Sequence, residues 1–213
     1  MPIHLTQIQA FLNRSGVEGP PQLRGYIPCT RKSGGSANYT GPESGHPADF
    51  IAMGASGVTV ATGVDLGQTD ADTLLRNGLE GGIVNMLRPY FTLRRDAAIK
   101  KLHALPLSVS ADTARALDNV TLCLHARLIA ARYNRDNPAA PFEALPRQAQ
   151  AAIFSLLFQR GTGVTGKAPN TWAALVAGSW QDAARHLCDA SLWDGYQGRR
   201  KLEGELLKEI VPV

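Results

Sequence analysis

Apolar residues recur at every third or fourth position close to the N-terminus, between Ile3 and Leu12. This spacing places them on one face of a helix and predicts an amphipathic helix over residues 3–14. Gly16 follows and is expected to end that helix. The chain is therefore predicted to begin with a short helix that buries one face.

Short runs rich in β-branched and aromatic residues follow the helix. Residues 22–28 predict one strand, which Pro28 is expected to limit because proline lacks the N–H of a strand interior. Residues 49–53 and 58–62 predict two more strands. Half of residues 30–47 are Gly, Ser or Pro, and that composition predicts a loop with no packed core of its own.

From residue 69 onward the pattern is helical. Asp70 is expected to start a short helix, and Ser108 or Ser110 to cap a long one that continues through Ile129. Pro146 fits the first turn of a helix that reaches Phe158. Further helices are expected over residues 83–87, 170–176, 179–190 and 197–210.

These elements predict an α+β fold in a single domain, residues 1–213. Residues 1–68 would form an N-terminal helix and a small β lobe, and residues 69–213 a larger helical lobe. A hydrophobic content of 44% is enough for a sizeable core.

Charge and segment composition limit the partners. The formal charge of +4 favours a polyanion such as nucleic acid, anionic lipid or bacterial cell wall. Residues 1–14 have no apolar run long enough for a signal peptide, and no stretch approaches the roughly 18 apolar residues of a membrane span. We therefore expect synthesis in the cytoplasm, no membrane insertion, and export by another route.

The sequence lacks the residue patterns typical of metal sites, phosphate-binding loops and disulfide frameworks. The five histidines show no short-range ligand spacing, and no phosphate-binding loop follows Gly34-Gly35, so neither a metal nor a cofactor is expected. The three cysteines, Cys29, Cys123 and Cys188, are predicted to be free thiols. The pair Arg94-Arg95 and the run Arg199-Arg200-Lys201 are expected to be solvated rather than to bind nucleic acid.

The first 68 residues contain only four acids, Glu18, Glu43, Asp49 and Asp65. Glu18 stands beside Val17 and two prolines, where desolvation would favour the protonated form that a general acid needs. Local sequence alone favours the alternative, a surface residue after a helix. Asp65 could hold a water or simply cap a turn, and Asp49 could face the same site or only begin a strand.

Three stretches in order resemble the phage-type lysozymes. They are Gly16 to Gly19 after a short helix, the run Ser56 to Gln68, and the segment Leu157 to Gly166 followed by Trp180 to Ala184. The second of these is most similar to the pesticin-like branch of that family. The resemblance covers most of the chain and implies a lysozyme-like fold and a muramidase, which hydrolyses the β-1,4 bond between N-acetylmuramic acid and N-acetylglucosamine in peptidoglycan.

The resemblance also implies roles for individual residues. Glu18 takes the position of the general acid, and Thr59 that of the threonine which helps to hold the attacking water. Phe158 and Gln159 lie in the segment that borders the glycan from the helical lobe. Residues 52–58 contain no acid, unlike the T-even pattern, so Asp65 is the working second carboxylate and Asp49 its competitor.

Alternatives to a simple muramidase remain open. A lytic transglycosylase needs only one acid/base glutamate, and a cell-wall binding module could keep the fold without catalysis. The muramidase could act as an antibacterial effector toxin, delivered to a rival's periplasm and accompanied by an immunity protein, or as a phage endolysin. We expect a monomer that binds glycan strands of peptidoglycan and no nucleic acid.

Overall fold

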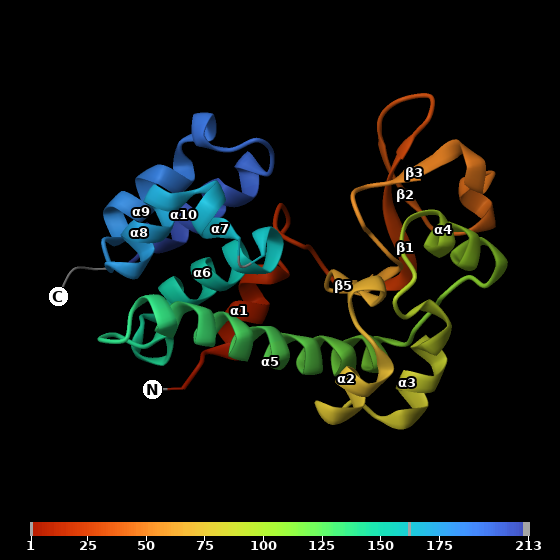
Figure 1. Cartoon of the computed structure of the whole chain (residues 1–213), viewed down its shortest axis with the longest axis horizontal. Helices are drawn as coiled ribbons and strands as arrows, with labels where there is room; N and C mark the ends of the chain where they lie inside the picture. The colour runs from red at the N-terminus through yellow and green to blue at the C-terminus, as the bar shows by residue number, and fades with distance from the viewer. Residues whose placement is uncertain (1, 162, 211–213) are drawn as a thin grey trace. The chain divides into compact units, whose positions relative to one another are not determined.

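The computed structural model describes residues 2–161 and 163–210 and places all the strands in the first third of the chain (Figure 1). The strands are β1 (Gln22–Arg31), β2 (Ser36–Tyr39), β3 (Phe50–Ala52), β4 (Thr59–Ala61) and β5 (Val64–Asp65). The helices are α1 (Leu5–Leu12), α2 (Ala71–Arg76), α3 (Gly81–Leu87), α4 (Arg95–Ala104), α5 (Ala111–Asp136), α6 (Arg147–Arg160), α7 (Val164–Lys167), α8 (Pro169–Val176), α9 (Trp180–Cys188) and α10 (Gln197–Lys208). The fold class is α+β, with a small N-terminal sheet and a larger helical part, as predicted.

Strand β1 organises an antiparallel sheet. It pairs with β2 on one side, and with β4 and β3 at different points along its length. Strand β5 then pairs with β4 at the end of the order β2-β1-β4-β5. The three predicted strands are therefore present, and two further strands join them.

The expectation of a limit at Pro28 and of a coreless loop over residues 30–47 was wrong. Strand β1 continues through Pro28 to Arg31, because the Pro28 carbonyl still accepts a hydrogen bond from the Met53 N–H at 2.8 Å. Gly34 and Gly35 adopt positive φ angles of 101° and 86° and form the turn into β2. The ring of Tyr39 on β2 is fully buried against Phe50, so this segment does contribute to the core.

Local signals located most helices correctly. The Asp70 carboxylate accepts the Thr73 N–H at the start of α2, and the Ser110 hydroxyl accepts the Thr113 N–H at the start of α5. Pro146 stands one position before the first turn of α6 instead of within it. Helix α4, which buries Ala98, Ile99 and Leu102, was missed because few apolar positions mark it.

The chain divides into two units, each with its own hydrophobic core. The sheet unit is Pro20–Thr121, and the helical unit is Met1–Gly19 with Leu122–Val213. This division differs from the predicted boundary near residue 68. Helix α1 packs on α6 through Ile8 and Phe11, whereas α2, α3 and α4 bury apolar residues in the core of the sheet unit.

The three cysteines, Cys29, Cys123 and Cys188, are free thiols. Burial raises the pKa of Cys29 to about 11, so its thiol stays protonated at neutral pH.

Among the described residues, no helix combines the length and apolar character required to cross a bilayer.

Candidate active site

Glu18 lies in a tight turn that follows α1 in the helical unit. The Leu12 carbonyl, at the end of α1, accepts the N–H groups of both Glu18 (3.0 Å) and Gly19 (3.2 Å). Gly16 and Gly19 have φ angles of 87° and 81°, a left-handed region that costs glycine little. The turn therefore fixes the Glu18 backbone against the end of the helix.

The Glu18 carboxylate forms an ion pair with Arg199 of α10. The side chain of Arg199 is 3% exposed and that of Glu18 is 21% exposed. The glutamate is therefore the solvent-accessible partner of a buried cation. The expectation that Val17 and the two prolines give this carboxyl an apolar environment was therefore wrong. A guanidinium group, not a hydrocarbon surface, holds the carboxylate in place.

Arg199 is itself fixed by buried partners. Its Nε donates to the Ser155 hydroxyl at 3.1 Å, and its Nη2 donates to the Ser155 carbonyl at 3.0 Å. Glu203, fully buried, accepts from the Ser155 hydroxyl at 2.6 Å and pairs with Arg200 at 3.0 Å. Burial raises the pKa of Glu203 and lowers that of Arg200 to about 10, while their mutual attraction opposes both shifts.

The two arginines were missed as site residues. The run Arg199-Arg200-Lys201 was expected to be solvated, which is wrong for the first two residues, since Arg199 and Arg200 are buried. The i,i+4 spacing of Arg199 and Glu203 is the local signal that could have indicated an ion pair. The other partner, Glu18, is too distant in sequence for any local pattern to reveal it.

The structure brings Gln159 to this arginine pair, whereas Phe158 packs against the helical core. The Gln159 side-chain carbonyl accepts from Arg200 at 3.4 Å, next to the arginine that holds Glu18. The ring of Phe158 stacks on Phe154 and meets His125 edge to face, partly buried against the helical core. Packing alone accounts for the contacts of Phe158.

Thr59 and Asp65 lie opposite each other in the sheet unit. They are directly paired across the antiparallel strands β4 and β5, so their side chains share one face, with Cβ atoms about 5 Å apart. The Thr59 hydroxyl is buried and donates to the Gly57 carbonyl at 3.4 Å. The spacing of six residues around Gly63 thus produces a hairpin that joins a hydroxyl and a carboxylate.

Backbone amides hold the Asp65 carboxylate at the end of this hairpin. Oδ1 accepts the N–H groups of Gly67 at 2.8 Å and Gly57 at 3.1 Å. Burial raises the pKa of Asp65, while these hydrogen bonds and the charge of Arg94 oppose the shift. Gly57 and Gly67 are required here, because a Cβ on either would come within 2.5 Å of the Leu93 carbonyl oxygen.

Asp49 lies elsewhere on the sheet. It is exposed and precedes β3, which pairs with β1 at Arg31, whereas Thr59 pairs with β1 at Tyr26. These two points are five residue steps apart along β1, a distance of about 17 Å. The geometry therefore places Asp65, and not Asp49, beside Thr59.

A comparison with protein-family models gives one match, described as "Pesticin: Bacterial toxin homologue of phage lysozyme, C-term", over residues 9–181. The chain belongs to the Pesticin family. A comparison with individually curated proteins gives no match at a significant level. Membership in the Pesticin family supports a muramidase-type peptidoglycan hydrolase, as the sequence motifs suggested.

The Pesticin match contains every predicted site residue, and it ends before Arg199. Among residues 2–161 and 163–210, no group of three or more His, Cys, Asp or Glu side chains could hold a metal ion. The candidate site residues described above supply carboxylates, a hydroxyl and guanidinium groups.

The buried carboxylate of Asp118 on α5 holds the turn of the Thr59–Asp65 hairpin, and no sequence pattern predicted this contact. Asp118 accepts the Thr62 N–H at 2.9 Å and the Thr62 hydroxyl at 2.7 Å. Ala61, just before Thr62, has a φ of 54°, which is strained for a residue with a side chain. Asp118 offsets that strain and keeps the turn of the hairpin in one conformation.

We expect Asp118→Ala to lower the free energy of unfolding by about 3 kcal/mol, because two hydrogen bonds to a buried carboxylate are lost. Asp118→Asn should cost much less, since the amide can accept from the Thr62 N–H and donate to its hydroxyl. Urea unfolding of both variants measures the difference. Equal losses in the two variants would contradict a clamp made of these hydrogen bonds.

Proposed function

We propose that the protein is a muramidase that hydrolyses the β-1,4 bond between N-acetylmuramic acid and N-acetylglucosamine. The observation that carries the proposal is the Thr59–Asp65 pair across β4 and β5, in a chain of the Pesticin family. A hydroxyl and a partly buried carboxylate on one face of a hairpin can hold and activate a water molecule.

Each carboxylate has a distinct role in this proposal. Glu18 acts in its protonated form and gives that proton to the glycosidic oxygen as the bond to the leaving sugar breaks, after which Arg199 pairs with the carboxylate that results. Asp65 accepts a proton from a water that Thr59 helps to orient, and that water attacks the sugar carbon. Arg199 is a positioning residue, because it holds Glu18 and contacts Ser155 and Glu203 rather than a reacting atom.

The identity of the products tests the proposal. Digestion of purified peptidoglycan should release muropeptides with a free reducing muramic acid, detected by mass spectrometry. A 1,6-anhydro muramic product would instead establish a lytic transglycosylase, in which the sugar's own hydroxyl replaces water. Sedimentation of the protein with insoluble peptidoglycan, without any released sugar, would establish a binding module and overturn the proposal.

For the biological role, we propose an antibacterial effector toxin that acts in the periplasm of a competitor. Support comes from the description of the matching family as a bacterial toxin homologue of phage lysozyme. Such a toxin needs an immunity protein that covers its catalytic residues. A small periplasmic protein encoded beside this chain that blocks its hydrolysis would support the toxin, whereas a pore-forming phage protein in that place would support an endolysin.

A further inference from the structure

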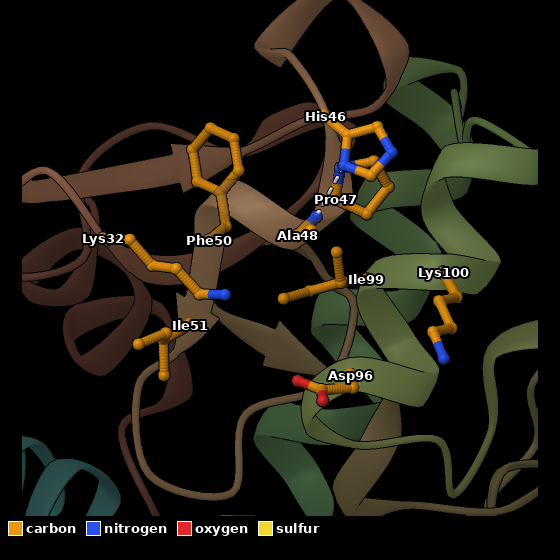
Figure 2. A pocket seen from close by; sticks show the side chains of 9 residues that line it. All are labelled: Lys32, His46, Pro47, Ala48, Phe50, Ile51, Asp96, Ile99 and Lys100. Atoms are coloured by element: carbon orange, nitrogen blue, oxygen red, sulfur yellow. Dashed lines mark hydrogen bonds between the residues drawn. The ribbon is translucent and has the colours of Figure 1, made fainter.

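Two side chains of α10 carry charge where solvent does not reach them. Many charged side chains of this protein are exposed, among them Lys32, Asp96 and Lys100 around a cavity of about 580 Å³ in the sheet unit (Figure 2). The side chains of Arg200 and Glu203, in the helical unit, are instead 0% exposed. A buried charge destabilises the fold unless nearby groups compensate it, so the charges around Glu203 must balance closely.

The Glu203 carboxylate lies between two guanidinium groups. Its Oε1 is 3.0 Å from Nη2 of Arg200 and 3.4 Å from Nε of Arg199, and it accepts from the Ser155 hydroxyl at 2.6 Å. Burial raises the pKa of Glu203, but the two cations and the hydroxyl oppose that shift and keep the group ionised. Glu203 is therefore a negative charge held in place by fixed partners.

Arg199 links Glu203 to the proposed general acid. Its Nη1 faces Glu18 and its Nε faces Glu203, so the two carboxylates contact different nitrogens of one guanidinium group. The third nitrogen, Nη2, donates to the Ser155 carbonyl at 3.0 Å. Among the described residues, Glu18 and Glu203 are the carboxylates that pair with Arg199. The charge of each carboxylate therefore affects the other through the guanidinium group that they share.

The other cation near this cluster has a carboxylate of its own. Arg160 of α6 lies over the Trp193 ring, as Arg200 does, and it pairs with Asp194 at 3.0 Å. The remaining titratable side chains on this side of α10 are those of His186, Cys188 and Tyr196. Glu203 is thus the carboxylate that compensates Arg199 whenever Glu18 holds a proton.

We propose that Glu203 is a positioning residue that allows Glu18 to keep its proton beside Arg199, an inference that rests on the proposed function. A guanidinium group without compensation favours the ionised form of a neighbouring carboxyl, and an ionised carboxyl cannot act as a general acid. Glu203 gives Arg199 a negative charge that remains while Glu18 is protonated. Once Glu18 has given its proton to the glycosidic oxygen, its carboxylate pairs with Arg199 again.

Removal of the Glu203 charge should move the titration of Glu18 to lower pH. Two carboxylates on one guanidinium group are no more than roughly 8 Å apart, and at an effective dielectric constant of about 20 this separation changes a titration by roughly one to two pH units. Solvent screens the partly exposed Glu18, so Glu203→Gln should lower its titration midpoint by about one pH unit. Glu203→Asp keeps the charge and should leave the midpoint close to that of the wild type.

Arg200→Met should move the midpoint in the opposite direction. Glu203 then compensates Arg199 alone, and Arg199 and the Ser155 hydroxyl still keep it ionised. A purely structural role for Glu203 predicts no opposite shifts in the two variants. Glu205→Gln is the matched control, because it removes an exposed carboxylate from the same helix and should leave the midpoint unchanged.

Carbon-13 NMR of the side-chain carboxyl groups measures this titration without catalysis, and the signal that Glu18→Gln lacks identifies Glu18. Hydrolysis of peptidoglycan measures it again, as the pH at which activity falls on the basic side. Circular dichroism shows whether Glu203→Gln folds. If it does not fold, Arg200→Met decides between a shift to higher pH, which supports the proposal, and no shift, which overturns it.

The two readouts separate this inference from the proposed function. An unchanged Glu18 midpoint in folded Glu203→Gln would overturn the role of Glu203, and the muramidase would stand if the wild type still hydrolysed peptidoglycan. Opposite shifts of the NMR midpoint in Glu203→Gln and Arg200→Met, with no hydrolysis by the wild type, would support the coupling of the two carboxylates and overturn the muramidase.

Discussion

Glu18→Gln should reduce the rate of peptidoglycan hydrolysis by about 10³-fold, within the range that general acid catalysis contributes. The amide cannot give a proton to the leaving oxygen. It keeps the size of the glutamate, and its carbonyl oxygen can still accept from Arg199, the partner of Glu18 in the wild type. Release of reducing sugars from purified peptidoglycan measures the rate.

Glu205→Gln is the matched control for this substitution. Glu205 belongs to the same unit and pairs with a lysine, but its side chain is 49% exposed and its partner is on the surface of α10. Its variant should therefore retain wild-type activity. Thermal unfolding should show a cooperative transition for both variants, because Arg199 keeps its ion pair with the buried Glu203 when Glu18 loses its charge. Full activity of Glu18→Gln would remove Glu18 from the mechanism.

The sequence predicted those parts of the fold that short-range patterns determine. The helix after Asp70 and the long helix after Ser110 begin where their capping side chains stand, because a cap is a contact within three residues. The two strands that were missed, β2 and β5, depend on pairing. Their residues form strands because β1 and β4 lie beside them, which composition alone does not reveal.

In the candidate site, too, the contacts between residues near in sequence could be predicted and those between distant residues could not. Thr59 and Asp65 could be expected to meet, since six residues with Gly63 between them allow one hairpin. The partners that fix the site, Arg199 for Glu18 and Asp118 for Thr62, are distant in sequence. The run Arg199-Arg200-Lys201 is typical of a solvated surface. Only the fold shows that the buried Glu203 pairs with the first two of these residues. Tertiary contacts, and not propensity, determine which charges this protein buries.

Asp65→Asn should lower the hydrolysis rate by about 10²-fold or more, and Asp49→Asn should leave it unchanged. The asparagine oxygen can still accept the N–H groups of Gly57 and Gly67, so the hairpin keeps its shape while the proton acceptor is lost. Asp49 is exposed and precedes Phe50, whose partner on β1 lies about 17 Å along that strand from the partner of Thr59. The reverse result would assign the second carboxylate to Asp49.

The pH dependence of the wild type provides an independent test of Asp65. Burial raises the pKa of this carboxyl above the ordinary aspartate value, so its protonated form persists to a higher pH than that of an exposed aspartate. A base must be ionised to accept a proton from water, and activity should therefore fall as the pH decreases through the raised pKa of Asp65. An acidic limb that persists unchanged in the residual activity of Asp65→Asn would show that a different group produces it. Loss of that limb in Asp65→Asn, with Asp49→Asn keeping it, would identify Asp65 as the base that the Thr59 hairpin presents.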